Sequence, residues 1–213
     1  VKQALSPDSY NQRGCHQPGR QPAALTHSHE HTPQDGLTYN PSSNPQGAIG
    51  TPCTIGSGWC SPVDNNNLNK LLVSMNVGPF CATILRPAGM AMKRGLDNLR
   101  AADSVLWGKL HASCICCRYI SGSTTYSNHA WGGACDFTID GQLDPYGDGL
   151  TQTGLIDVYP HLHAEGFYWG AGFGYPGTSS EDAMHFEVSQ QKFDEWEADG
   201  SLDPDAPWPV PAS

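Results

Sequence analysis

The pattern of hydrophobic and polar positions divides the chain near residue 62. Residues 1–62 are rich in Pro, Gly, Ser, Asn and Gln, and they show neither a helical nor an alternating apolar period. Such a segment buries little apolar surface by itself, so we predict a loop-rich N-terminal arm whose role stays open. Residues 63–213 carry the periodic patterns of regular elements and are predicted to form a second, globular domain.

Helical periodicity is clearest in the first part of this second domain. Asp64 and the asparagines at 65–67 can cap a short helix through LNKLLVSM. Pro87 and Ala88 then open a longer stretch, AGMAMKRGLDNLRAADSVLWG, in which apolar residues recur at intervals of three and four. Both elements are predicted to pack against a core.

Two further helices are predicted toward the C-terminus. Asp157 can cap the first, with Pro160 tolerated in its first turn and Gly166 at its end. The second is predicted over Gln190–Ala198, after Ser189.

Strand patterns lie among these helices. LHASCICCRYI has β-branched, aromatic and cysteine residues, GGACDFTID alternates, and MHFEV is a short third strand. Together the elements predict an α+β fold, in which helices flank a small antiparallel sheet.

Charge and hydropathy exclude several classes of function. The chain has 11 Lys and Arg against 21 Asp and Glu, a formal charge of -10, which argues against a surface that neutralises phosphates. No apolar run approaches the roughly 18 to 20 residues of a membrane span, and the start, VKQALSPDSY, lacks the pattern of a signal peptide. We therefore expect a soluble, already processed monomer without nucleic-acid or membrane partners.

Cysteine content indicates an oxidising compartment. An even number of cysteines in a chain with few charges is typical of a secreted protein with a disulfide framework, and the CICC cluster has the wrong spacing for a zinc knuckle. Pairing of Cys53 with Cys60 through the short loop TIGSGW is the one bridge that the sequence favours. The full set is Cys15, Cys53, Cys60, Cys81, Cys114, Cys116, Cys117 and Cys135.

The stretch SNHAWGGACD suggests half of a metal site. Asp136 would project from one face of its strand, while the step at 132–133 bends the preceding loop so that His129 returns toward it. Pairing with the HFEV strand would bring His185 to the same face. Two histidines and one carboxylate leave the fourth position of a tetrahedral zinc open for water. The alternative for His185 is a hydrogen-bonded histidine at a strand edge.

Several motifs resemble one family. SNHAWGGACD matches S-x-H-x-x-G-x-A-x-D, and EDAMHFE matches the later D-x-x-H element, of the zinc D-alanyl-D-alanine carboxypeptidase superfamily. CRYISGSTTYSNHAWGGACDF and FYWGAGF resemble its extensin-like carboxy-terminal and VanY-like branch. The resemblance covers roughly residues 88–190, and residues 1–62 have no counterpart in it.

The resemblance implies a single Zn²⁺ per chain, bound by His129, Asp136 and His185. Asp182 would be the general base, a position where many members have Glu; the neighbouring Glu181 is out of phase with the metal face. The implied activity is that of a secreted zinc peptidase that hydrolyses D-amino-acid-containing stem peptides of peptidoglycan, by a carboxypeptidase or endopeptidase reaction.

The same resemblance implies roles around the metal. Arg118 would stabilise the oxyanion or bind a substrate carboxylate, the alternative being a surface salt bridge. Ser127 would orient the substrate or the loop, and Trp131 and Trp169 would line the cleft unless they belong to the core. Glu187 is expected to orient a metal ligand rather than bind zinc.

Three alternatives stay open. The fold can serve as an inactive binding domain for cell wall or extracellular matrix, although Asp182 argues against this reading. A structural zinc would need a fourth ligand, either Glu187 or His111. In the arm, THSHEHT can bind a metal weakly through His27, His29 and His31, but a solvated loop is the stronger interpretation.

Overall fold

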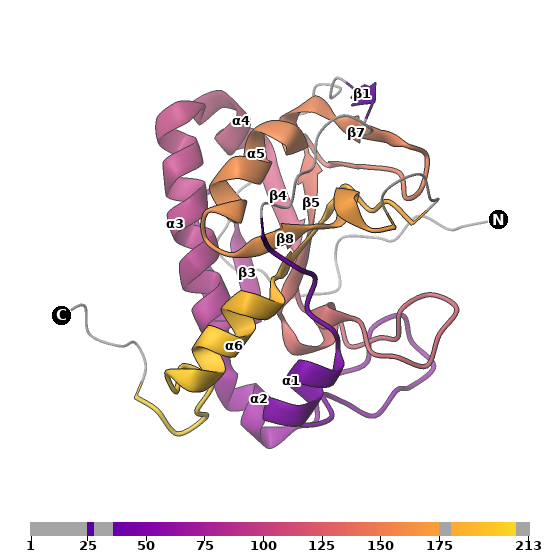
Figure 1. Ribbon diagram of the computed structural model, residues 1–213, viewed down its shortest axis with the longest axis vertical. Coiled ribbons are helices and arrows are strands. Elements are labelled where there is room, and N and C mark those ends of the chain that lie inside the picture. The colour runs from indigo at the N-terminus through magenta and orange to yellow at the C-terminus, as the bar shows by residue number, and fades with distance from the viewer. Residues whose placement is uncertain (1–24, 28–35, 175–179, 208–213) are drawn as a thin grey trace.

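The computed structural model describes residues 25–27, 36–174 and 180–207. Helices and strands are interspersed along this part of the chain, as Figure 1 shows. The helices are α1 (Ser43–Ala48), α2 (Asn66–Leu71), α3 (Arg86–Ala102), α4 (Ser104–Lys109), α5 (Thr153–His163) and α6 (Gln190–Ala198). The strands are β1 (Leu25–His27), β2 (Leu72–Asn76), β3 (Cys81–Leu85), β4 (Leu110–Ser113), β5 (Ala134–Ile139), β6 (Gln142–Leu143), β7 (Leu150–Gln152), β8 (Phe167–Trp169) and β9 (His185–Val188).

A small antiparallel sheet forms the centre of the molecule. Its strands follow the order β4-β5-β9-β8, with β6 paired to β5. The register of β5 and β9 places Asp136 opposite His185. The α+β fold with a small antiparallel sheet is confirmed, including the pairing of these two strands.

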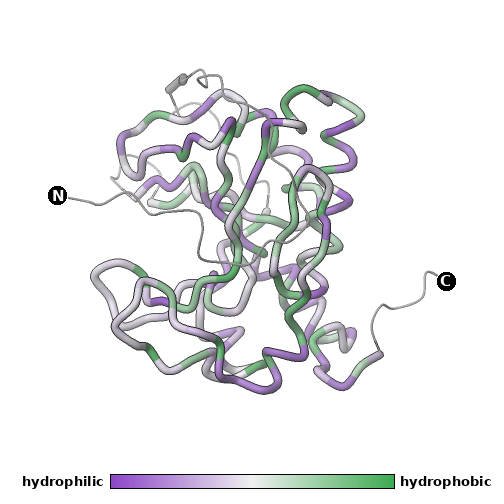
Figure 2. The backbone as a smooth tube through the Cα atoms, turned by 180° about the vertical axis from the view of Figure 1, so that it is seen from behind, coloured by the Kyte–Doolittle hydropathy of each residue, from purple (hydrophilic) through white to green (hydrophobic). Residues whose placement is uncertain are grey.

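Two helices cover one side of this sheet. Figure 1 shows α3 and α5 side by side, and α3 packs against β2 and β3 while α5 packs against β7 and β8. Figure 2 shows hydrophobic stretches running through the centre of the molecule. A Cβ on Gly95 of α3 would lie 2.8 Å from the carbonyl oxygen of His161, so a glycine permits the close approach of α5. Leu96 and Leu162 are fully buried at this contact layer.

The predicted helix through LNKLLVSM is only half helical. After α2 the chain continues as β2, which forms a hairpin with β3. Asn65 caps α2 by accepting a hydrogen bond from the backbone N–H of Leu68, whereas Asp64 accepts one from Thr54. The apolar run fits either element, and the cross-strand partners of β3 decide in favour of a strand.

The other predicted helices require smaller corrections. The long helical stretch is divided at Asp103, whose side chain caps α4. Helix α5 begins at Thr153, so Asp157 lies inside it rather than at its N-terminus, and Gly166 follows its end at a φ of +90°. The prediction for α6 is confirmed, since Ser189 accepts a hydrogen bond from the backbone of Lys192.

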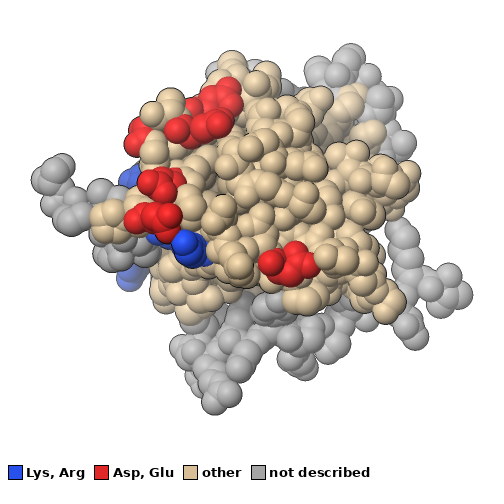
Figure 3. Space-filling view, turned by 90° about the horizontal axis from the view of Figure 1, so that it is seen from below, with Lys and Arg blue, Asp and Glu red and all other residues tan. Residues whose placement is uncertain are grey.

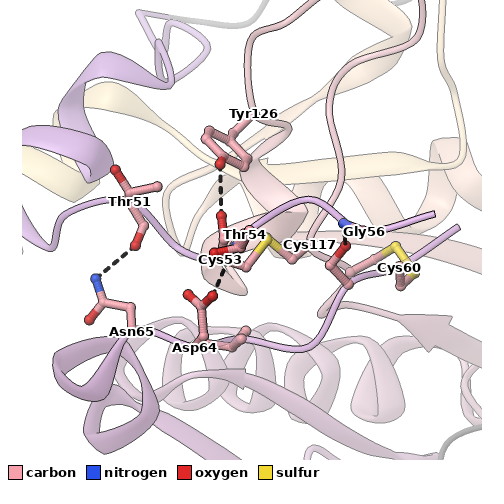
Figure 4. The surroundings of a disulfide bond; sticks show 12 residues. Thr51, Cys53, Thr54, Gly56, Cys60, Asp64, Asn65, Cys117 and Tyr126 are labelled. Atoms are coloured by element: carbon pink, nitrogen blue, oxygen red, sulfur yellow. Dashed lines mark hydrogen bonds between the residues drawn. A yellow bond between two sulfur atoms is a disulfide. The ribbon is translucent and has the colours of Figure 1, made fainter. Parts of the chain in front are cut away.

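The predicted bridge between Cys53 and Cys60 is wrong. Cys53 pairs with Cys117 and Cys60 pairs with Cys116, so both cysteines reach across to the CICC segment. Figure 4 shows these bridges beside the hydrogen bond from the Tyr126 hydroxyl to the Cys53 carbonyl. Neighbouring residues in extended chain point to opposite sides, so consecutive cysteines can take two separate partners.

The third bridge in the described part of the chain lies next to the candidate metal residues. It joins Cys114, just after β4, to Cys135 in β5. Cys135 therefore directs its sulfur away from the face that carries Asp136, as the alternation of a strand requires. Disulfides of this kind are typical of extracellular proteins.

The surface agrees with the acidic composition. On the face shown in Figure 3, acidic side chains form several groups and basic side chains are few. Among the described residues, no helix has the length and apolar character needed to span a bilayer.

Candidate metal centre

His129, Asp136 and His185 converge from three different elements. His129 lies in the 3₁₀ helix Asn128–Trp131, Asp136 in β5, and His185 opens β9. The His129 Nε2 atom lies 3.0 Å from Asp136 Oδ1 and 3.2 Å from His185 Nδ1, and the last two atoms are 3.1 Å apart. They are the only group of three such side chains, in the described ranges, with atoms close enough to share a metal ion.

Local backbone features produce this convergence. The antiparallel register of β5 and β9 sets Asp136 beside His185. Gly132 ends the 3₁₀ helix with a φ of +69°, and a Cβ there would lie 2.8 Å from the backbone nitrogen of Leu85. Only glycine combines a positive φ with the absence of a Cβ, so Gly132 allows the loop to turn back and place His129 beside the sheet.

The far sides of both histidine rings are held by hydrogen-bond acceptors. His129 Nδ1 lies 2.7 Å from the Cys114 carbonyl oxygen, and His185 Nε2 lies 3.0 Å from Glu187 Oε2. These acceptors take an N–H group from each ring, so the nitrogens that remain for a metal are His129 Nε2 and His185 Nδ1, each of which presents a lone pair when its ring carries a single proton. Both lone pairs point toward the Asp136 carboxylate, so three electron-pair donors meet at one place.

Charge effects show that this place favours a cation. Burial opposes ionisation of Asp136, but His129 and His185 outweigh it and hold its pKa below the usual value. Burial likewise lowers the pKa of His185, yet Asp136 and Glu187 together raise it to about 10. The surroundings therefore stabilise positive charge between the three side chains.

The donor set fits zinc. Two imidazole nitrogens and one carboxylate oxygen are ordinary zinc ligands, and three protein ligands are the number found in catalytic sites. Ligands placed about 2.0 to 2.1 Å from a tetrahedral zinc lie roughly 3.3 to 3.4 Å apart. The observed separations of 3.0 to 3.2 Å are close to this value.

Asp182 lies beside the cluster. Its carbonyl oxygen accepts the backbone N–H of His185, and its carboxylate oxygen Oδ1 is buried without a hydrogen-bond partner among the described residues. Burial raises the pKa of Asp182 to about 6, while the histidines of the cluster act in the opposite direction. A buried carboxylate with an unused oxygen next to the site is a suitable proton acceptor.

Glu181 faces other surroundings. Its Oε1 accepts the backbone N–H of Ala183, and its Oε2 lies 3.4 Å from the backbone nitrogen of Gly149. Burial raises its pKa to about 7, with a further contribution from Asp144 rather than from the metal cluster. The two neighbouring carboxylates therefore lie in different environments.

Arg118 lies close enough to Asp182 for its charge to oppose the rise that burial causes in the pKa of that carboxyl group. Its guanidinium group lies 5.5 Å from the centre of the Trp59 ring, and Nη1 donates to the carbonyl of Tyr119. No ion pair with a carboxylate involves Arg118 within the described residues. The bridges of Cys60 and Cys53 to the CICC segment hold the Trp59 loop beside it.

The predicted substrate-binding residues are mainly buried. Ser127 is 5% exposed, and its backbone N–H donates to the Arg118 carbonyl, which connects the two segments. Trp131 and Trp169 are each 1% exposed, and their indole N–H groups donate to the carbonyls of Gly50 and Ala183. The tryptophans thus belong to the core and do not line an open wall.

The alternative metal ligands are placed elsewhere. Glu187 contacts the ring nitrogen of His185 that points away from the cluster, as expected for a residue that orients the ligand. His111 packs against the ring of Phe80 and is absent from the cluster. A structural zinc with either residue as fourth ligand is not supported. His29 and His31 lie outside the described residues, as does the side chain of His27.

Sequence reasoning missed three residues around the site. Asn40 and Asn128 both hydrogen-bond to Glu187, and Gly170 packs against the Asp182 carbonyl. The signal for Gly170 was its place in FYWGAGF, one of the motifs that carry the family resemblance. Asn40 contributes through its backbone, so its side chain carries no signal of this contact.

These features define a candidate hydrolytic metal site on a small antiparallel sheet. Residues 121–188, about a third of the chain, match a family model described as D-alanyl-D-alanine carboxypeptidase. The match spans His129, Asp136, Asp182 and His185, and it confirms the resemblance to that superfamily and supports a peptidase. No curated protein matches the chain.

Stability should depend on pH through the acidic residues next to Asp182. Burial raises the pKa of Glu181 to about 7 and that of Asp144 to about 6, so the folded state holds their protons more tightly than the unfolded state. The stability that these two protonated carboxyl groups contribute is complete below about pH 4, the usual pKa of a carboxyl group in an unfolded chain. It is lost as pH rises through 6 and 7, where the two groups ionise in the folded state. Urea unfolding at pH 5 and 7.5 measures the decline, which we expect to be smaller in Glu181→Gln. An equal decline in both proteins would contradict the assignment.

Proposed function

We propose that the chain is a secreted zinc-dependent peptidase that hydrolyses D-amino-acid-containing stem peptides of peptidoglycan. The observation that carries this proposal is the convergence of three donor atoms within 3.2 Å, next to a buried carboxylate with a free oxygen. The family match over the same residues supports the substrate class. In this proposal residues 63–213 are the catalytic domain, residues 1–62 are its arm, and the protein acts as a monomer.

His129, Asp136 and His185 would hold the zinc ion. When bound, zinc supplies Lewis acidity, which polarises the scissile carbonyl and makes water a better nucleophile. Asp182 accepts the proton of the attacking water and transfers it to the leaving amine. Arg118 offers its fixed positive charge to the oxyanion that develops on the carbonyl oxygen, or to a carboxylate of the substrate.

Metal analysis tests the site directly. We expect about one zinc per purified chain, with histidine nitrogens about 2.0 to 2.1 Å from the metal by X-ray absorption. His129→Ala should lose the zinc, because a site reduced to two ligands binds it far more weakly. His111→Ala is the matched control, since that half-buried histidine lies outside the cluster, and it should keep the metal.

The substrate class needs its own measurement. Purified peptidoglycan incubated with the zinc-loaded protein should release free amino groups, and chelation should stop the release. A protein that carries zinc and binds the wall without releasing amines would instead support an inactive binding domain on the same fold. A wild-type protein that takes up no zinc would overturn the proposal.

A further inference from the structure

A segment of the N-terminal arm lies against the strand that carries His185. This segment comprises residues 36–42, and Figure 1 shows the indigo chain before α1 passing in front of the sheet. We propose that it is a positioning element of the metal centre, which fixes His185 through Glu187. The inference rests on the proposed metal site and assigns a role to a part of the chain that lies outside the family match.

Hydrogen bonds dock this segment along the end of β9 and the start of α6. The Thr38 carbonyl accepts the backbone N–H of Gln190, and the Thr38 N–H donates to Gln191 Oε1 at 3.0 Å. The Gln191 amide donates back to the carbonyl of Gly36 at 2.9 Å. These hydrogen bonds hold residues 36–38 against the start of α6, directly before Asn40 reaches Glu187.

Glu187 receives three donors, one of which comes from the arm. The backbone N–H of Asn40 donates to Oε1 at 3.0 Å, and the Asn128 amide donates to Oε2 at 2.9 Å. The third donor is Nε2 of His185, also at Oε2 and at 3.0 Å. Glu187 is 5% exposed, so water cannot replace a missing donor without entering the core.

Asn128 joins the arm to both metal histidines. Its single amide nitrogen donates to the carbonyl of Asn40 at 2.7 Å as well as to Glu187, and the next residue is His129. Asn128 and Asn40 are both buried. The backbone of Asn40, the Asn128 amide and the Glu187 carboxylate therefore form one hydrogen-bonded ring, on the side of His185 that faces away from the metal site.

This group determines which nitrogen of His185 is free. With Glu187 held in place, Nε2 carries the proton and Nδ1 presents its lone pair toward Asp136. Loss of such a carboxylate partner typically weakens metal binding by about 10- to 100-fold, because ring orientation and basicity are no longer fixed. The Asn40 N–H acts on His185 indirectly, because it orients the Glu187 carboxylate that binds the ring.

Zinc affinity of full-length variants tests the proposal, measured by competition with a chromogenic chelator. Asn40→Pro removes the backbone donor to Glu187, and Asn128→Leu removes the amide while keeping a similar volume. We expect each to weaken zinc binding by about 10-fold or more, approaching the effect of Glu187→Gln. The matched control is Asn44→Ala, which removes a side-chain bond to Asn40 Oδ1 but leaves Glu187 untouched.

A double-mutant cycle separates positioning from a general loss of structure. If Asn128 acts through Glu187, then Asn128→Leu should weaken zinc binding much less in the Glu187→Gln background than in the wild type. Additive losses would overturn the proposal, as would wild-type affinity in both Asn40→Pro and Asn128→Leu. These outcomes differ from failure of the proposed function, in which the wild type itself binds no zinc.

Discussion

Asp182→Asn should lower turnover by about 10²- to 10⁴-fold while the zinc stays bound, because a positioned general base contributes that much. Asparagine has nearly the same shape but cannot accept a proton from water. Asp182 is not one of the three converging donors, so metal content should not change. Steady-state rates on peptidoglycan fragments, with zinc determined on the same samples, measure both quantities.

Glu181→Gln is the matched control for this experiment. Glu181 accepts hydrogen bonds from the backbone of Ala183 and Gly149, and the charges that raise its pKa further are those of Asp144 and Asp148 rather than those of the cluster. Its replacement should therefore change turnover by only a few-fold. If Glu181→Gln lost most of its turnover while Asp182→Asn stayed nearly normal, Glu181 and not Asp182 would be the general base. If both variants had normal turnover, neither residue would take part in catalysis.

The metal cluster was accessible from the sequence because its geometry follows from local rules. The alternation of β5 and β9 sets the faces of Asp136 and His185, and Gly132 supplies the turn that returns His129. Each of these rules involves residues close together in the chain or paired in neighbouring strands. The resemblance then supplied Asp182 and Arg118, which spacing alone does not identify.

Other features depend on contacts that no local pattern encodes. The LLVSMN run fits a helix and a strand equally well until β3 is available as a partner. Cysteine pairing depends on which loops meet in space, so the short loop between Cys53 and Cys60 was a poor guide. The arm contacts Glu187 through a backbone N–H, which every residue except proline possesses.

Gly170 shows how tightly the site is packed against the sheet. A Cβ at this position would lie 2.5 Å from the carbonyl oxygen of Asp182 and 3.0 Å from the Cβ of His185. The Gly170 carbonyl also accepts the backbone N–H of Asp182 at 3.0 Å. The atom nearest to the added methyl group is backbone, so rotation of a side chain cannot relieve the overlap.

Gly170→Ala should therefore destabilise the protein and disable the site together. Overpacking of this kind costs about 1 to 3 kcal/mol, and displacement of catalytic groups by about 1 Å can lower the rate about 10²-fold. We expect lower urea stability with and without zinc, weaker zinc binding because His185 moves, and turnover reduced about 100-fold. Chemical denaturation, chelator competition and steady-state rates measure the three effects.

Gly108→Ala is the control for adding the same methyl group elsewhere. Gly108 lies in α4, and a Cβ there would meet nothing within 4 Å. Alanine favours a helix interior over glycine by about 1 kcal/mol, so this variant should be as stable as the wild type or slightly more so, with unchanged turnover. Wild-type stability and rate in Gly170→Ala would mean that the segment from Asp182 to His185 can move away from residue 170 without cost. In that case its close packing would not be what holds the base and the second histidine in place.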